Sequence, residues 1–431
     1  MWSSRALPSA TWIRTTGKIV VPMSVRRVAM LSVHTSPLAQ PGAGDGGGMN
    51  VYISSLASAL ARAGVECDVL TRAEHPGQDA IVDVEPGVRV VHLDAGPRST
   101  VGKDALFGLL DELVEAARLH LTTTSEPFDV LHSHYWISGA VGHRLKHEID
   151  MPLVGTFHTL ARTKVAAGIT DDPPQRARVE RETIACLDRM IASTPDERSE
   201  LVATYGAEPD RVEVIAPGVD HAMFSPGDAA SARRRLGLPT DRPVLLFVGR
   251  IQPLKGVDLA IRCLASMRDS RALLVVVGGP SGADGIAEVD RLHALARDLE
   301  VEERVRWEPP QPHGALVDWY RGADVCLMPS RTESFGLVAL EAAACGTPVV
   351  AANVGGLRSL IDADHTGFLV DGRTGYDFAA PVERLLADPG LAGEIGVSAA
   401  ARSGRYTWNI TAARLRRVYA DLGARELVRC S

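Results

Sequence analysis

The sequence predicts an α/β protein with two doubly wound, Rossmann-like domains that face a central cleft. Short apolar runs typical of buried strands alternate with segments of helical periodicity, a pattern typical of parallel sheets covered by helices. This alternation begins near Arg26 and begins again near Pro243. A stretch rich in proline, glycine and charge separates the two series at residues 218–243. The 431 residues are enough for two such domains.

The first series begins with a buried strand at residues 26–32, followed by a glycine-rich loop at 40–50 and a helix at 51–63. Further elements are expected as strands at 65–71, 88–93 and 130–132 and as a helix at 106–121. Two polar segments, 132–136 and 155–159, end strands. Side chains at the strand ends of such a sheet face the ligand crevice. We therefore expect the histidines of these segments to face the cleft, namely His132, His134 and His158.

The second series has five expected strands and three expected helices. The strands lie at residues 243–249, 272–279, 305–308, 325–329 and 348–352, and the helices at 256–267, 286–299 and 316–322. The expected domain boundaries are 23–220 for the first domain and 221–404 for the second. An amphipathic stretch at residues 405–425 is expected to form a surface helix.

Composition excludes several classes of protein. With 45% hydrophobic and 23% charged residues, the chain is expected to fold as a globular protein. A net charge of −7, with both signs well mixed, argues against a nucleic-acid-binding protein. No apolar run approaches the roughly 18 residues of a membrane span. Residues 1–22 lack the apolar core of a secretory signal and are expected to be an extension, or to precede a true start at Met23.

The six cysteines are scattered, with no close pair and no metal-site spacing. Five of them lie in apolar or helical surroundings, and we expect these five to be small core residues of a cytoplasmic protein. The histidines near the strand ends could be ligands of a zinc site, but neither a carboxylate nor a cysteine cluster completes such a site. Contacts with substrate hydroxyl and phosphate groups are the favoured interpretation.

The segment from Glu333 to Glu341 is the most informative in the chain. Its two carboxylates flank the start of an expected helix, with a Ser-Phe-Gly turn between them. Backbone N–H groups at a helix start are unpaired and carry partial positive charge, so they suit phosphate. The carboxylates can accept hydrogen bonds from hydroxyl groups. A phosphate flanked by hydroxyl-bearing groups is the chemistry of a nucleotide sugar, so this segment favours a nucleotide-sugar site. The alternative interpretation of the segment is an ordinary helix with one first-turn acid and one buried acid.

Two further segments suit phosphate. Consecutive glycines within residues 45–50 let backbone N–H groups converge on an anion, although the loop is also compatible with simple flexibility. Arg250 and Lys255 lie between a strand end and a helix start. Two cations there can neutralise a diphosphate leaving group as its charge develops. Spacing alone leaves open that they only cap a solvated helix.

These segments together resemble retaining glycosyltransferases of the GT-B type, the large family that includes sucrose-phosphate synthases and phosphatidylinositol mannosyltransferases. Residues 33–52, 132–136 and 158–161 are similar, more narrowly, to the inositol-phosphate glycosyltransferases that begin mycothiol biosynthesis. The resemblance runs from about Arg26 to about Leu422. It implies a GT-B fold in which the helix at 405–425 crosses back to the first domain.

For the donor, the resemblance implies UDP-N-acetylglucosamine. Arg250 and Lys255 would hold the diphosphate, Glu333 the hexose hydroxyls and Glu341 the ribose hydroxyls. The remaining donor contacts would come from Gln311 at the uracil, and from Gln40, Pro41 and Gly48 in the other domain. The resemblance implies front-face attack, in which the acceptor hydroxyl approaches as UDP leaves. The catalytic set would then be His158, which lies against the donor sugar, with Glu333, Arg250 and Lys255.

For the acceptor, the resemblance implies 1D-myo-inositol 3-phosphate. A phosphate dianion needs charged and hydroxyl donors that converge from several directions. Four residues of the types that this subgroup uses come from separate segments: Lys103, Tyr135, Thr159 and Arg176. Singly, Lys103 and Arg176 are ordinary surface charges, and Arg178 and Arg181 lie close to Arg176. The resemblance adds to this acceptor set His34, Asp45, Gly46, Gly47, Gly48, Met49 and Asn50.

No Asp-x-Asp metal site is evident, so we expect no cofactor to be required for the chemical step. The resemblance implies a homodimer and a structural Mg²⁺ ion held near Tyr320, Arg321, Ala323 and Thr347. Two alternatives stay open: a related transferase that glycosylates an aminocyclitol or another natural-product acceptor, and a non-catalytic nucleotide-sugar-binding protein. A dinucleotide-dependent dehydrogenase is disfavoured because the glycine fingerprint and its following acid are missing.

Overall fold

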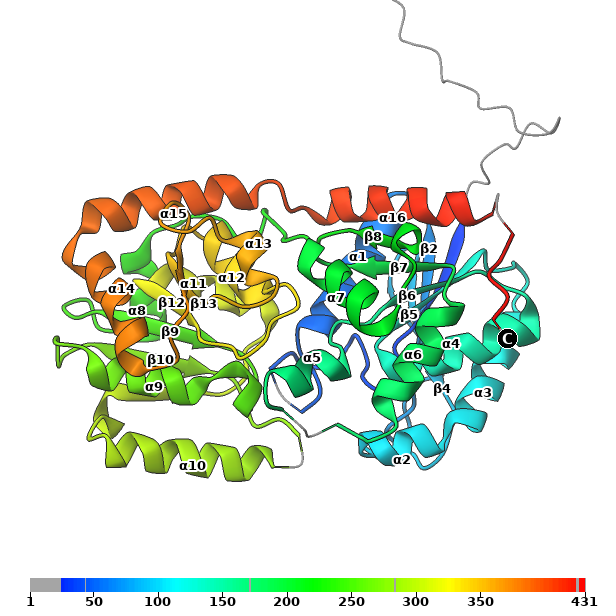
Figure 1. Ribbon diagram of the computed structural model, residues 1–431, viewed down its shortest axis with the longest axis horizontal. Coiled ribbons are helices and arrows are strands. Elements are labelled where there is room, and N and C mark those ends of the chain that lie inside the picture. Colours follow the sequence, from blue (N-terminus) through cyan, green and yellow to red (C-terminus); the bar gives the residue numbers. More distant parts are fainter. Residues whose placement is uncertain (1–24, 43, 170–171, 283, 424–425, 431) are drawn as a thin grey trace, which may run out of the picture.

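The computed structural model describes residues 25–42, 44–169, 172–282, 284–423 and 426–430. The extension expected at residues 1–22 lies outside the described residues. The chain forms two lobes, and in each a twisted sheet is covered by helices (Figure 1). The predicted α/β class with two doubly wound domains is therefore confirmed.

The first sheet has eight strands in the order β3-β4-β2-β1-β5-β6-β7-β8. All neighbours pair in parallel except β3 and β4. Strand β3 was not predicted, because its side chains are largely exposed and do not form an apolar run. The strands are β1 (Arg27–Leu31), β2 (Glu66–Arg72), β3 (Ile81–Glu85), β4 (Val88–Leu93), β5 (Val130–His134), β6 (Leu153–Thr156), β7 (Arg189–Ala192) and β8 (Val212–Val214).

Within the part of the chain that the structure describes, seven α-helices accompany this sheet. The single helix predicted at residues 106–121 is in fact two helices that meet at Leu109, and this break places Lys103 at the first position of α2. Helix α1 begins three residues earlier than predicted, because Asn50 caps it by accepting a hydrogen bond from the Gly47 N–H. The helices are α1 (Gly48–Arg62), α2 (Lys103–Gly108), α3 (Leu110–Thr123), α4 (Trp136–Ile149), α5 (Ala161–Ala166), α6 (Arg176–Cys186) and α7 (Pro195–Tyr205).

The second sheet has six parallel strands in the order β11-β10-β9-β12-β13-β14. The strand order reverses between β9 and β12, so a crevice opens at their carboxyl ends. The strands are β9 (Val244–Val248), β10 (Leu273–Val277), β11 (Val305–Glu308), β12 (Val325–Met328), β13 (Val349–Ala352) and β14 (Phe368–Val370). The helices are α8 (Ala229–Leu236), α9 (Val257–Ser266), α10 (Gly285–Asp298), α11 (Leu316–Gly322), α12 (Leu337–Ala344), α13 (Leu357–Leu360), α14 (Gly375–Ala387) and α15 (Pro389–Ser403).

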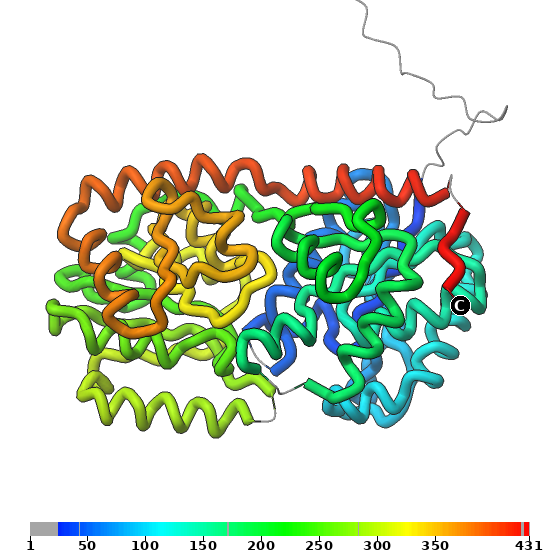
Figure 2. Tube along the Cα trace, in the orientation of Figure 1, coloured from blue at the N-terminus to red at the C-terminus, as the bar shows by residue number. Residues whose placement is uncertain are grey.

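The last helix, α16 (Trp408–Leu422), leaves the second domain and packs on the first (Figure 2). The Trp408 and Tyr52 rings meet edge to face with centroids 5.4 Å apart. The Tyr419 hydroxyl lies 2.6 Å from Nδ1 of His132, whose Nε2 lies 2.9 Å from the Thr156 hydroxyl. His132 therefore fastens α16 to the sheet, and the prediction that it faces the cleft is wrong. Among the described helices, none combines the length and the apolar character needed to cross a bilayer.

Candidate active site

A deep cleft between the two domains receives the amino-terminal ends of two helices, α1 from the first domain and α12 from the second. A Cβ atom placed on Gly48, the first residue of α1, would lie 3.5 Å from Cδ1 of Leu337, the first residue of α12. Both helix starts therefore direct unpaired N–H groups and partial positive charge towards the same space. Predicted site residues in the lining are Pro41, Gly47, Gly48, Met49, His158, Thr159, Arg250, Lys255, Gln311, Glu333 and Glu341.

The turn that precedes α12 is held in place by close backbone contacts. Gly336 has φ 101°, a conformation that glycine adopts without the strain other residues incur. The Gly356 N–H donates to the Glu333 carbonyl at 2.8 Å, which fixes the backbone of the turn. Within α12, the Leu340 N–H bonds the Gly336 carbonyl, so the three N–H groups before it have no intrahelical acceptor. The turn thus offers an anion site beside the Glu333 carboxylate.

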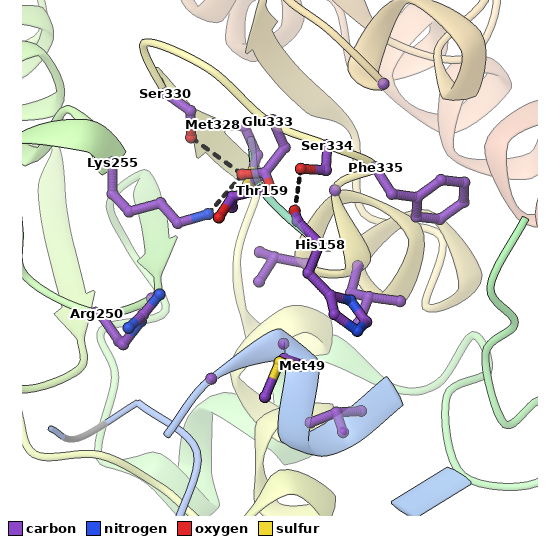
Figure 3. A pocket seen from close by; sticks show the side chains of 18 of the residues that line it. Met49, His158, Thr159, Arg250, Lys255, Met328, Ser330, Glu333, Ser334 and Phe335 are labelled. Carbon is purple, nitrogen blue, oxygen red and sulfur yellow. Dashed lines mark hydrogen bonds and ion pairs between the residues drawn. The ribbon is translucent and has the colours of Figure 1, made fainter. Parts of the chain in front are cut away.

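Lys255 and Glu333 form an ion pair in this cleft, with 2.6 Å between Nζ and Oε2 (Figure 3). The Ser330 hydroxyl is 3.4 Å from the same carboxylate oxygen. Gly256 makes this arrangement possible, since a Cβ there would lie 2.3 Å from the Pro329 carbonyl oxygen. Arg250 points into the same space and does not share the ion pair (Figure 3).

Glu341 is almost completely buried, at 5% exposure, and accepts two hydrogen bonds. Nε2 of His313 and the Tyr320 hydroxyl lie 2.7 Å from its two carboxylate oxygens. Burial alone would lower the pKa of His313, but the hydrogen bond and negative charge of Glu341 raise that pKa overall. Glu341 is therefore a buried acid, as the alternative interpretation expected, and each of its oxygens has a donor.

Contacts between the domains fix the loop that precedes α1. Nε2 of Gln40 donates to the Gln311 carbonyl at 2.5 Å, and the Gly279 N–H donates to the Gly42 carbonyl at 2.9 Å. At Gly47, a Cβ would lie 3.1 Å from Nε of Arg250. The absence of a side chain therefore lets the first domain's loop approach a cation of the second domain.

The predicted acceptor residues converge on Arg176, which is only 1% exposed. Its guanidinium donates to the Tyr135 hydroxyl at 3.1 Å, and to the carbonyl and hydroxyl of Thr159 at 2.6 and 3.0 Å. It also pairs with Glu180 at 2.7 Å and with Asp172 at 2.9 Å. The structure therefore separates Arg176 from Arg178, whose side chain is 67% exposed.

Lys103 and His34 lie beside this cluster. Nζ of Lys103 is 3.1 Å from Oδ1 of Asp45, and the His34 ring lies 4.3 Å from the Tyr135 ring between centroids. Burial, assisted by the positive charge of Lys103, lowers the pKa of His34 to about 3. Although burial acts to raise it, the pKa of Asp45 is lowered, chiefly by Lys103. A neutral imidazole and an ionised carboxylate therefore stand at this position.

The remaining loop residues have different surroundings. Asn50 is buried, and its amide donates to the Thr35 hydroxyl at 2.9 Å and to the Ser36 carbonyl at 2.6 Å. Because its oxygen caps α1, every polar atom of this side chain supports the loop. The Gly46 carbonyl accepts from the Gly42 N–H at 3.0 Å, which closes the loop on itself. Met49 lies in the cleft lining (Figure 3).

His158 is the only one of the three strand-end histidines in the cleft lining formed by the described residues. Burial lowers its pKa to about 3, so its imidazole is neutral near pH 7. Its Nε2 lies 3.0 Å from Nδ1 of His134, and its backbone carbonyl accepts from the Ser334 hydroxyl of the other domain (Figure 3). Its φ of 60° is rare for a residue with a side chain. His134 is fully buried behind it, and the prediction that it faces the cleft is wrong.

The residues predicted to hold Mg²⁺ gather at the end of α11. The Thr347 hydroxyl donates to the Tyr320 carbonyl at 2.7 Å, the Ala323 N–H bonds the same carbonyl at 3.2 Å, and the Arg321 guanidinium bonds Ser225. These groups are neutral or cationic, and they include none of the carboxylates through which proteins usually bind Mg²⁺. One Asp-x-Asp triplet occurs in the sequence, at Asp362–Asp364. Both its carboxylates are more than half exposed and lie outside the cleft lining.

The expectation of small core cysteines is confirmed for four that are unpaired, whereas two cysteines form a pair that was not expected. Cys67, Cys263, Cys326 and Cys345 are free and buried. Cys186 and Cys430, 244 residues apart in sequence, form a disulfide. Spacing along the chain gave no sign of a pair that only the path of the C-terminal segment creates.

Comparisons with known proteins identify relatives of this chain among the glycosyltransferases. The family described as Glycosyl transferases group 1 matches residues 228–402, and the Glycosyl transferase 4-like domain matches residues 47–218. A D-inositol 3-phosphate glycosyltransferase of Acidothermus cellulolyticus is 47% identical over 93% of this chain and 91% of that protein. The corresponding enzyme of Kineococcus radiotolerans is 48% identical over 92% and 95%. The chain belongs to the D-inositol 3-phosphate glycosyltransferase family.

A solved structure supports the fold of this glycosyltransferase. The sucrose-phosphate synthase of Thermosynechococcus elongatus superposes with a TM-score of 0.87 at 32% identity, covering 93% of this chain and 99% of that one. Sequence reasoning missed several groups around the glycosyltransferase site: His313 at Glu341, Ser334 at the domain contact, and the carboxylates behind Arg176. Glu180 and Asp172 each lie four residues from Arg176, the spacing of a helical ion pair, although only Glu180 shares helix α6 with it.

Proposed function

We propose that the chain transfers N-acetylglucosamine from UDP-N-acetylglucosamine to 1D-myo-inositol 3-phosphate with retention of configuration, the first step of mycothiol biosynthesis. The observation that most supports this acceptor is the convergence of Lys103, Tyr135, Thr159 and Arg176 beside the cleft. Two cations and two hydroxyls in one place suit a phosphate dianion. The names of the relatives point to the same acceptor.

The donor occupies the second domain in this proposal. Arg250, Lys255 and the start of α12 hold the diphosphate and stabilise the charge that develops as UDP leaves. Glu333 accepts hydrogen bonds from hexose hydroxyls, and Glu341 does so from the ribose. The ion pair with Lys255 and the bonds from His313 orient these carboxylates before the donor arrives. The uracil end lies by Gln311, and Gln40, Pro41 and Gly48 approach from the first domain.

The transfer follows the front-face course. The acceptor hydroxyl oxygen bonds to the anomeric carbon on the face from which UDP departs, and the bond from that carbon to the β-phosphate oxygen breaks. The hydroxyl proton passes to the departing phosphate oxygen, so the products are a glycoside and UDP. The protein supplies orientation and electrostatic stabilisation without a covalent intermediate.

His158 contributes as a neutral group. With its pKa at about 3, it exchanges hydrogen bonds with the sugar and does not act as a cation near pH 7. Its carbonyl holds the Ser334 hydroxyl, so the histidine and the diphosphate turn are linked across the cleft. Closure of the domains around this link excludes water, which otherwise hydrolyses the donor.

Phosphate binding at Arg176 requires one of its anionic partners to yield. Glu180 is fully buried, whereas Asp172 has a second cationic partner, Lys164, at 3.0 Å. A phosphate that replaces Asp172 at the guanidinium therefore leaves the Asp172 carboxylate paired. We propose this exchange as the step that admits the acceptor phosphate.

Three further properties stay predictions: a homodimer, a cytoplasmic location and a structural Mg²⁺ ion near Tyr320. The groups at Tyr320, Arg321, Ala323 and Thr347 fit Mg²⁺ poorly, since they bring no carboxylate. No step of the proposed reaction passes through such an ion.

A UDP-release assay with three acceptors tests the function. With UDP-N-acetylglucosamine as donor, we expect kcat/KM for 1D-myo-inositol 3-phosphate to exceed that for free inositol by at least about 100-fold, since charged hydrogen bonds contribute about 1.5–3 kcal/mol each. Equal rates with free inositol or 2-deoxystreptamine would instead assign the chain to the aminocyclitol-type transferases. Donor binding without UDP release under any pairing would contradict the transferase assignment itself.

A further inference from the structure

Four metal-ligating side chains from three parts of the chain meet on the first domain, away from the cleft. His143 and His147 lie one turn apart on α4, Cys186 ends α6, and Cys430 lies in the C-terminal segment. One ligand atom of each lies within 4.8 Å of the others. Figure 1 shows the last, red segment of the chain descending beside α4. None of these residues takes part in the proposed reaction.

Three nitrogen-to-sulfur distances have the scale of a tetrahedral metal site. Nε2 of His147 is 3.2 Å from Sγ of Cys186 and 3.1 Å from Sγ of Cys430, and Nε2 of His143 is 3.3 Å from Sγ of Cys430. Zinc bonds of about 2.0–2.3 Å at tetrahedral angles separate neighbouring ligand atoms by roughly 3.3–3.8 Å. Both imidazoles thus direct a nitrogen at the sulfur atoms from nearly the right separation.

A disulfide alone gives no reason for this arrangement. A covalent S–S bond needs no imidazole partner, yet two histidines one helical turn apart on α4 approach it, His147 at both sulfurs and His143 at that of Cys430. Two thiolates with two imidazoles form one of the common structural zinc sets. Soft thiolate ligands with imidazole favour Zn²⁺ over Mg²⁺ or Ca²⁺.

The C-terminal segment is already held at this place by a second contact. The Val428 N–H donates to Oδ1 of Asp188 at 2.7 Å, and the same oxygen accepts from Nζ of Lys146 at 2.7 Å. Lys146 precedes His147 on α4, and Asp188 lies two residues beyond Cys186. The backbone of the segment is therefore anchored next to the four ligands whatever the state of the sulfurs.

We propose that the reduced protein binds one Zn²⁺ ion through His143, His147, Cys186 and Cys430. A thiol or phosphine reductant supplies two electrons and, with two protons from water, converts the disulfide to two thiols. Zinc then displaces the two thiol protons as the Zn–S bonds form, and the metal keeps its charge. The disulfide and the zinc site are alternative links between the C-terminal segment and helices α4 and α6.

Zinc retention by the full chain tests this proposal. The protein is reduced with a phosphine, freed of reductant, mixed with ZnCl₂ and passed through a desalting column before metal analysis. We expect about one zinc ion per chain for the parent protein. Cys430→Ser and His147→Ala should each lower the retained zinc at least about fivefold, because three ligands hold the metal less tightly than four. His75→Ala, an exposed histidine elsewhere on the first domain, should retain the parent amount.

Cobalt substitution gives an independent measurement. Co²⁺ in the reduced parent protein should show ligand-field bands of a tetrahedral site with thiolate-to-metal charge transfer, and Cys430→Ser should lose part of the charge-transfer intensity. Because Cys430 lies outside both sheets, its replacement should leave them intact, which circular dichroism checks. The proposal is overturned if the reduced parent keeps no more zinc than Cys430→Ser, or if His147→Ala keeps the full zinc content and cobalt spectrum. Either result would mean that no zinc site replaces the disulfide in the reduced protein.

Discussion

The donor side and the acceptor side of the cleft are built in opposite ways. On the donor side, the charged groups come from two short motifs, and Lys255 and Glu333 meet in a cleft-facing pair. On the acceptor side, Arg176 is buried and already balanced by Glu180 and Asp172. The charges of the donor side face the ligand directly. On the acceptor side, in our proposal, the ligand must replace one of the carboxylates that already pair with Arg176.

This difference suggests that the two sides of the cleft have different roles in binding and specificity. Lys255 and Glu333 are only partly exposed, at 23% and 14%, but both line the cleft, so each can contact a ligand directly. A buried and satisfied network fixes hydroxyl and guanidinium positions at higher cost, and it rejects a ligand without phosphate because that ligand cannot replace Asp172. The acceptor side is therefore where specificity should reside.

The largest effect is expected on the donor side. Lys255→Ala and Glu333→Gln should each reduce kcat about 100- to 1000-fold, the usual cost of removing one group that stabilises a developing charge. UDP release at saturating donor and acceptor measures this effect. Near-normal turnover in either variant would show that the donor does not lie between these residues.

Arg268→Ala is the matched control for this experiment. Arg268 belongs to the same domain, and its side chain is 88% exposed. Its replacement should leave kcat within about twofold of the parent value, because exposed ion pairs contribute little. Circular dichroism and the thermal unfolding midpoint of all three variants separate loss of chemistry from loss of fold.

The next effect distinguishes the two sides directly. Arg176→Lys keeps a charge but loses the forked geometry that reaches Tyr135 and Thr159, so the acceptor KM should rise about 10- to 100-fold while the donor KM changes less than about twofold. Arg176→Ala should act in the same direction. It also leaves Glu180 buried without its partner, so it should lower the unfolding free energy by about 3–5 kcal/mol.

Arg178→Ala provides the comparison for Arg176. Arg178 is exposed and pairs only with Glu182 among the contacts described for it. Both KM values should stay near those of the parent protein. Equal rises of acceptor and donor KM in Arg176→Lys would remove this residue from the acceptor site and abolish the proposed contrast.

A smaller effect is expected at Glu341. Glu341→Gln keeps the shape of the side chain but weakens its bonds with His313 and Tyr320, and with the ribose in our proposal. The donor KM should rise about tenfold, the equivalent of one hydrogen bond to a charged group, with the acceptor KM unchanged. Glu302→Gln, at an exposed position of the same domain, is the control. A selective rise in acceptor KM would move Glu341 out of the donor site.

The donor side of the site could be predicted from the sequence more directly than the acceptor side. The donor elements are motifs contiguous in sequence, so strand ends and helix starts alone indicated a phosphate site before Glu341. The acceptor cluster joins residues as distant as Lys103 and Arg176, and only resemblance brought them together beforehand. Asp172 lies four residues before Arg176, but it precedes the start of α6, so helical spacing alone does not predict its contact with the guanidinium.

Other features depended on the path of the whole chain. His132 ends a strand, as a ligand-binding histidine does, yet α16 covers it with Tyr419 from 287 residues away. The pairing of Cys430 with Cys186 has the same origin, because the segment after α16 returns to α4. Alternation of strands and helices predicts the layers of a fold, but it carries no information about what a terminal segment covers.

The smallest effects are pH-dependent and have opposite signs on the two sides. The folded-state pKa of His313 is raised by Glu341, so its protonation stabilises the fold below the unfolded pKa of about 6.5, and this contribution is lost as pH rises through the folded pKa. The folded-state pKa of His34 is lowered to about 3, so the fold loses stability as pH falls below the unfolded value. As pH falls from about 9 to about 5, urea unfolding should therefore show that the parent gains stability relative to His313→Asn. Over the same range, from about pH 9 to about pH 5, the parent should lose stability relative to His34→Asn. Parallel slopes for the two variants would mean that the charge environments of the donor and acceptor sides do not differ in this way.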